Sequence, residues 1–170
     1  AAGESFFHHY LYAVLRAVNE IPEFRFRIDA EGRVVYFDHV DMLTPIKVKE
    51  NGRFFTIRLP WNTDFQTFYT TAKAIINDID PNGNPYDMEK VGGKDLLDVI
   101  LLSATPDLYF TSLTCTQEHR HGSNYPLMNA GKAILKEGKL VMPIAMTIHH
   151  GFIDGHHLSL FYKKVEKFLK

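Results

Sequence analysis

The sequence contains a single cysteine, Cys115, among its 170 residues. One cysteine cannot form a disulfide within the chain, so a fold stabilised by internal disulfides is excluded. The low cysteine content also favours a reducing compartment. The formal net charge is −1, and the basic residues are scattered among acidic ones, so nucleic acid is not an expected partner. No apolar run approaches the roughly 20 residues that a membrane-spanning helix needs. We therefore expect a soluble, cytoplasmic protein without a membrane partner.

Hydrophobic residues are nevertheless plentiful, at 45% of the chain, and 13% of the residues are aromatic. This composition is sufficient to bury a substantial core, which predicts one compact domain over residues 1–170. An apolar pattern typical of a helix begins almost immediately after the first residues, AAGES. We therefore expect the domain to be incomplete at its N-terminus.

Three segments have the periodicity of amphipathic helices. Apolar residues recur at three- and four-residue steps over residues 5–19, over 65–76 after Asp64, and over 158–168 at the end of the chain. Asp64 is a suitable N-cap for the second helix.

Other segments are rich in aromatic and β-branched residues, which favours strands. Two hairpins are predicted, over 24–37 and 45–59, and two strands, over 98–104 and 108–116. A third hairpin has its predicted arms at 133–135 and 140–148, with Pro143 marking a bulge or an edge position in the second arm. That second arm is nearly all apolar, so we expect it to be covered on both faces. Helices and hairpins in this order predict an α/β two-layer sandwich.

The most informative segment has the pattern His-His-x-x-x-Asp-Gly, from His149 to Gly155, where a predicted strand ends and a helix begins. From average residue usage, a preset pattern of this kind occurs by chance on the order of once in several thousand chains of this length. The pattern is therefore moderately specific.

This segment resembles the active-site signature of the chloramphenicol acetyltransferase family and, more loosely, that of the acyltransferase domains of 2-oxoacid dehydrogenase complexes. The resemblance extends over nearly the whole chain, since the Phe110-Thr-Ser112 segment, Tyr125-Pro126, Gly138 and Pro143 follow in the family's order. It implies the coenzyme A-dependent acyltransferase fold, with a mixed β-sheet and helices on one face. It also implies a homotrimer with active sites between subunits, and acetyl-CoA and chloramphenicol as substrates.

The same resemblance implies roles for four residues. His150 matches the catalytic base, Ser112 the serine that binds the tetrahedral intermediate, and Asp154 an aspartate that supports the site structurally. Lys132 matches a lysine near the cofactor, although Ala133 stands where a tyrosine commonly follows.

In the family, the aspartate pairs with an arginine close to the N-terminus, and the matching segment would precede Ala1. Arg25 or Arg27 replaces that arginine only if the fold brings one of them to Asp154.

The chemistry of these residue types supports their proposed roles. An alcohol does not lose its proton in advance, so an imidazole with a pKa of about 6.5 must accept the proton while the oxygen attacks the thioester. The carbonyl then becomes an oxyanion, and a hydroxyl donor such as Ser112 contributes roughly 3 kcal/mol by hydrogen bonding to it. The resemblance implies direct transfer in a ternary complex.

Each of these residues also has a purely structural interpretation. A histidine at a strand end is commonly a satisfied polar residue, a serine such as Ser112 commonly faces solvent, Lys132 is commonly a solvated charge, and Asp154 is suited to be a helix N-cap. His149 should point to the opposite face of the strand from His150.

The sequence also allows three other interpretations. The first is a zinc site formed by the four histidines at positions 149, 150, 156 and 157. The adjacent pairs lie on a strand and on a helix and point in different directions, so we predict no metal. His119 and His121 are predicted to lie in an exposed loop. The other two alternatives are an acyltransferase of this fold with another acceptor, and a binding protein of this fold that has lost catalysis.

Overall fold

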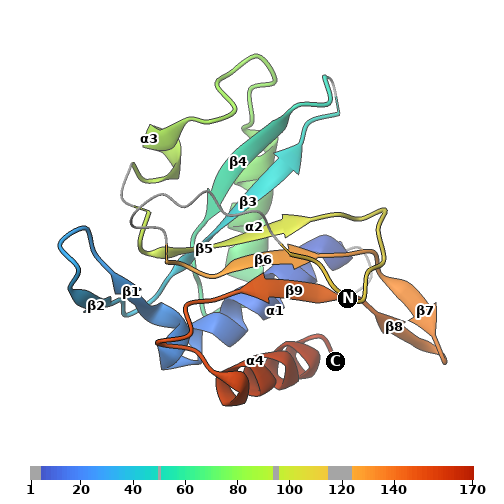
Figure 1. Cartoon of the computed structure of the whole chain (residues 1–170). Coiled ribbons are helices and arrows are strands. Elements are labelled where there is room, and N and C mark those ends of the chain that lie inside the picture. Colours follow the sequence, from blue (N-terminus) through green and yellow to red (C-terminus); the bar gives the residue numbers. More distant parts are fainter. Residues whose placement is uncertain (1–4, 50, 94–95, 115–123) are drawn as a thin grey trace.

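The computed structural model describes residues 5–49, 51–93, 96–114 and 124–170 (Figure 1). The helical elements are α1 (Phe6–Asn19), the 3-10 helix η1 (Pro22–Arg25), α2 (Phe65–Asn77), α3 (Met88–Val91) and α4 (Gly155–Phe168). The strands are β1 (Phe26–Ile28), β2 (Val34–Tyr36), β3 (Asp41–Lys47), β4 (Phe54–Leu59), β5 (Val99–Ala104), β6 (Leu127–Ala130), β7 (Ile134–Lys136), β8 (Lys139–Val141) and β9 (Ile144–Thr147).

The three predicted helices are confirmed, and local chemistry fixes where each begins. The Ser5 hydroxyl accepts a hydrogen bond from the backbone N–H of Phe7 at the start of α1. Asp64 accepts from the N–H of Thr67 at the start of α2, at 2.8 Å, and Asp154 caps α4. These side-chain acceptors satisfy amide groups that have no partner inside the first helical turn.

One mixed sheet of five strands forms the centre of the molecule, in the order β4-β3-β5-β6-β9. β3, β5 and β6 run parallel to one another, whereas β4 and β9 pair antiparallel at the two edges. The two first predicted hairpins are also confirmed. β1 pairs antiparallel with β2, and β3 pairs with β4, although β3 begins four residues before the predicted arm.

The three long helices pack on one face of this sheet. Met42 of β3 and Ile100 of β5 belong to the same buried cluster as Leu11 of α1, Phe68 of α2 and Phe161 of α4. The alternate strand residues, Leu43, Val99 and Leu101, face the other way and pack with Val91 of the short helix α3. The predicted α/β two-layer architecture, with a mixed sheet and the main helices on one face, is confirmed.

The strand predicted over residues 108–116 is wrong. Residues 108–114 form no strand, and Cys115 and Thr116 lie outside the described residues. Both edges of β5 are already occupied, by β3 and β6, so the following segment cannot pair beside β5. Instead, the Leu108 carbonyl accepts a hydrogen bond from the N–H of Lys132, which draws this segment across the end of β6.

The hairpin predicted over residues 133–148 is only partly correct. β7 and β8 form a short hairpin that projects from the body of the molecule (Figure 1), whereas β9 is a separate strand that pairs with the unpredicted strand β6. Pro143 lies between β8 and β9, and its carbonyl accepts from the N–H of Gly131. Because proline has no N–H to donate, the pairing of β8 with β7 ends before Pro143, and the chain then pairs with β6 as β9.

β9 was expected to be covered on both faces, but all four of its residues are only half-buried in this chain.

Among the described helices, none combines the length and the hydrophobicity needed to cross a membrane.

Candidate active site

The signature segment forms a tight turn between β9 and α4. The carbonyl of His149 accepts hydrogen bonds from the N–H groups of Phe152 and Ile153, at 3.0 and 3.1 Å. His150 lies inside this turn and is exposed, and its side chain makes no hydrogen bond or ion pair with the described parts of the chain. Its imidazole is therefore accessible to a substrate that approaches from outside the chain.

The side chain of His149 folds back over the same turn. Its ring lies 4.8 Å from the ring of Phe152, measured between centroids. A Cβ atom at Gly151 would lie 2.9 Å from Cε1 of His149, which is closer than van der Waals contact allows. Gly151 thus makes room for the His149 ring. The structural roles of Gly151 and Phe152 were not predicted from the sequence, although a glycine next to the histidine pair is a signal for a close approach.

Asp154 caps α4 through a reciprocal arrangement with His157. Its carboxylate accepts hydrogen bonds from the N–H groups of His156 and His157, at 2.8 and 3.2 Å. In return, the N–H of Asp154 donates to Nδ1 of His157, at 3.2 Å. The hydrogen bond from the N–H of His157, together with that from His156, holds the pKa of the Asp154 carboxyl below its usual value. The predicted N-cap is confirmed.

Neither arginine that was considered as a partner of Asp154 pairs with it. Arg25 donates to the carbonyls of Phe37 and Asp38 in the chain after β2. Arg27 is buried, 1% exposed, and its guanidinium donates to the carbonyls of Phe24, Phe26 and Val99. Within the described ranges, His157 is the side chain that Asp154 contacts instead.

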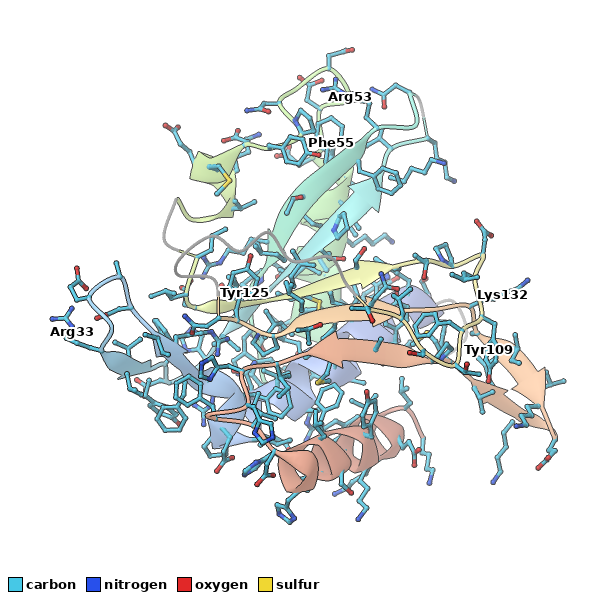
Figure 2. All side chains as sticks on the ribbon, viewed as in Figure 1. Arg33, Arg53, Phe55, Tyr109, Tyr125 and Lys132 are labelled. Atoms are coloured by element: carbon cyan, nitrogen blue, oxygen red, sulfur yellow. The ribbon has the colours of Figure 1, made fainter. Side chains whose placement is uncertain are left out.

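Lys132 lies just beyond β6, and its side chain is exposed. Figure 2 shows Lys132 and Tyr109 together at one end of the sheet, whereas Tyr125, which precedes β6, lies towards the other end. A Cβ atom at Gly131 would lie 2.7 Å from the ring of Phe110 and 2.8 Å from the Leu108 carbonyl. The segment that leads to Ser112 is thereby held against the end of β6 where Lys132 lies.

The segment before Ser112 and the turn that carries His150 are attached at opposite ends of β9. Phe110, two residues before Ser112, packs against Gly131, which bonds to Pro143 before β9 begins. His150 follows Thr147, where β9 ends. Four residues of extended strand span about 13 Å. No hydrogen bond joins Ser112 and His150 within the described chain, and both side chains are exposed.

Two other observations concern possible ligand sites. Among the residues that the structure describes, no three histidine, cysteine, aspartate or glutamate side chains gather in a way that would hold a metal ion, and His119 and His121 fall outside that set. A cavity of about 280 Å³ lies against the other edge of the sheet, lined by Phe55 of β4, Asp78 after α2 and Lys90 of α3, and none of the four predicted site residues borders it.

Comparison with solved structures identifies the class of fold. The dihydrolipoamide acetyltransferase of Azotobacter vinelandii superimposes with a TM-score of 0.65 at 14% sequence identity, covering 97% of this chain and 68% of that chain. At this identity the likeness concerns the fold alone, which is that of a coenzyme A-dependent acyltransferase.

The family follows from closer matches. The family model described as chloramphenicol acetyltransferase matches residues 1–166. A solved structure titled chloramphenicol acetyltransferase is 70% identical, with a TM-score of 0.91, and the match covers 99% of this chain and 79% of that one. A chloramphenicol acetyltransferase of Staphylococcus intermedius is 26% identical over 162 residues, which are 94% of this chain and 73% of the relative. The chain belongs to the chloramphenicol acetyltransferase family.

Proposed function

We propose that this protein is an acetyl-CoA-dependent acyltransferase that acetylates a hydroxyl group of chloramphenicol or a similar acceptor, with His150 as the general base. Family membership over residues 1–166 and the 70% identity to a solved chloramphenicol acetyltransferase support the reaction. The observation that supports the role of His150 is its place in the signature turn after β9, where the imidazole is exposed and has no partner in the described chain.

The proposed reaction is a direct transfer. The neutral His150 imidazole accepts the proton of the acceptor hydroxyl while the oxygen attacks the thioester carbonyl, which forms a tetrahedral oxyanion. The Ser112 hydroxyl donates a hydrogen bond to that oxyanion. Collapse of the intermediate breaks the carbon–sulfur bond, and the leaving thiolate takes up the proton from the imidazolium. The products are coenzyme A and an O-acetyl ester, and His150 is neutral again.

The attachment of the Ser112 segment and of the His150 turn at opposite ends of β9 supports a site built from two copies. The imidazole must lie about 3 Å from the acceptor hydroxyl, and the Ser112 hydroxyl about 3 Å from the oxyanion on the carbonyl that this hydroxyl attacks. In the proposed homotrimer, His150 of one copy faces Ser112 of the next. β9 is an edge strand with half-buried residues, and such an edge is suited to being covered by another copy.

The remaining roles are also proposals. Lys132 is an exposed cation at the end of the sheet to which the Ser112 segment is held, and this position suits a contact with coenzyme A phosphates. Asp154 stabilises the end of the signature turn by capping α4. Acetyl-CoA is a co-substrate that is consumed at each turnover, and no resident cofactor is required. Because acetyl-CoA is held inside cells, we place the protein in the cytoplasm.

The test is the release of free thiol when the protein is mixed with acetyl-CoA and chloramphenicol, with the ester identified by mass spectrometry. Thiol release that requires both substrates is expected. Release with other alcohols but not with chloramphenicol would redirect the proposal to another acceptor. Binding of acetyl-CoA without any product, in a panel of hydroxylated acceptors, would contradict catalysis and favour a binding protein.

A further inference from the structure

A row of aromatic rings connects the β1–β2 hairpin to the turn that carries His150. The ring of Phe152 lies 4.8 Å from that of His149 on one side and 5.7 Å from that of Phe26 on the other. Phe26, on β1, contacts Tyr36, on β2, at 4.9 Å. The Arg25 guanidinium lies over the outer face of the row, 4.8 Å from the centre of the Tyr36 ring. All of these distances are in the range of favourable ring contacts.

His150 needs such support because its own side chain has none in the described chain. An exposed imidazole without a hydrogen bond takes its direction from the backbone of the turn. That backbone is closed by the two hydrogen bonds to the carbonyl of His149. His149 therefore contributes twice, since its carbonyl closes the turn and its ring ties the turn to Phe152.

Figure 1 shows the β1–β2 hairpin and the β9–α4 turn at the same end of the molecule, although they are far apart in the sequence. Arg33, labelled in Figure 2, marks the tip of this hairpin, away from the turn. The base of the hairpin is fixed to the main sheet, because Arg27 donates to the carbonyl of Val99 in β5. The hairpin that carries part of the ring row is thus anchored to the main sheet.

We infer that the rings of His149, Phe152, Phe26 and Tyr36 position the His150 turn, so that the β1–β2 hairpin sets the direction of the catalytic imidazole. This inference rests on the proposed function. His149 and the three other aromatic residues are positioning residues, because they would act on the reaction through the turn that carries His150. A displacement of about 1 Å in a reacting group lowers the rate on the order of a hundredfold, so loosening the row should lower kcat about 10- to 100-fold and leave KM nearly unchanged.

The sharpest perturbation is Gly151→Ala, which adds one methyl group where it would lie 2.9 Å from Cε1 of His149. The wild-type enzyme is first shown to turn over, so that loss of the proposed function is recognised separately. Gly151→Ala is expected to lower kcat within the stated range. The Hε1 resonance of His149 in the NMR spectrum is expected to move as its ring leaves the face of Phe152, with an unchanged melting temperature.

A double-mutant cycle separates this route from a general disturbance of the turn. In a His149→Ala background the added methyl group has no ring to displace, so Gly151→Ala should have no further effect on kcat. An equal loss of kcat in both backgrounds would overturn the inference, because the effect would not pass through the His149 ring. An unchanged kcat in Gly151→Ala with a shifted His149 resonance would overturn it as well.

The hairpin is tested by Phe26→Leu, which removes a ring from the middle of the row. We expect kcat to fall with little change in KM, and Phe26→Tyr to restore it. The matched control is Val34→Ala, since Val34 lies in the same hairpin, is 61% exposed, and has no part in the row. Equal kcat values for Phe26→Leu and Val34→Ala would overturn the role of the hairpin.

Discussion

The sharpest consequence of the site geometry is that two inactive variants should restore activity when they are combined. Ser112→Ala removes the proposed oxyanion donor, and His150→Ala removes the proposed base. Both groups must reach one reacting centre, the imidazole at the acceptor hydroxyl and the serine hydroxyl at the oxyanion. In a single chain the segment before Ser112 and the turn with His150 are attached at opposite ends of β9, whose four residues span about 13 Å. If each active site takes His150 from one copy and Ser112 from the next, mixed assemblies contain some intact sites.

The expected recovery can be calculated. In an equal, random mixture half of the histidines and half of the serines are intact, so roughly one quarter of all sites contain both, and in trimers that contain both variants about one third of the sites do. The two variants are co-expressed with different tags, and assemblies that carry both tags are purified and assayed for thiol release. A mixture of His150→Ala with His150→Gln is the control and should recover nothing. A Ser112→Ala and His150→Ala mixture that stays as inactive as its parents would refute the placement of the site between copies.

Three further predictions concern folding. Asp154→Ala should lower both the melting temperature and kcat. Asp154→Asn keeps a capping oxygen and should lower both quantities less. The control is Asp64→Ala, at the cap of α2, which should lower only the melting temperature. Phe161→Ala should cost about 3–5 kcal/mol in urea unfolding, because Phe161 is fully buried and stacks on Phe24 at 5.4 Å; a loss below about 1 kcal/mol would contradict this packing. His8, whose ring nitrogens are shielded and unpartnered within the described residues, has a pKa lowered by burial and by Lys73. His8 therefore binds a proton more readily in the unfolded chain than in the folded one. The free energy of unfolding consequently falls as the pH drops through about 6.5. The melting temperature of His8→Phe should fall less than that of the wild type between about pH 7.5 and pH 5.5.

Local sequence patterns predicted most of the fold. The helix that begins after Ser5 and the one that begins after Asp64 follow from a capping residue and a regular apolar face, both of which are encoded within one segment. The first two hairpins follow from runs of strand-forming residues around glycine-containing turns. These features depend on neighbours in the sequence, so the pattern is sufficient to identify them.

The errors occur where structure depends on distant partners. β6 has only four residues and follows a proline, and it is a strand because β5 and β9 pair with its two sides. Residues 108–114 have a strand-like composition but pair with no strand of the sheet. Whether a short segment joins a sheet is decided by available hydrogen-bonding edges, which the local pattern does not contain.

In the candidate site, too, the local sequence predicted some features and missed those that depend on distant residues. His150 and Asp154 were identified by a local signature, and the cap that Asp154 forms is as predicted. The contact between Phe152 and Phe26 joins two segments that are distant in the sequence, so the role of Phe152 was not predicted. The catalytic roles of His150 and Ser112 stay predictions.

The most direct test of the account is the turnover number of His150→Ala with acetyl-CoA and chloramphenicol. His150 is exposed and makes no hydrogen bond with the described residues, so the variant should fold with an unchanged melting temperature. Loss of the base should lower kcat about 10²- to 10⁴-fold, with KM for acetyl-CoA nearly unaltered. A folded His150→Ala protein that turns over as fast as the wild type would contradict the account.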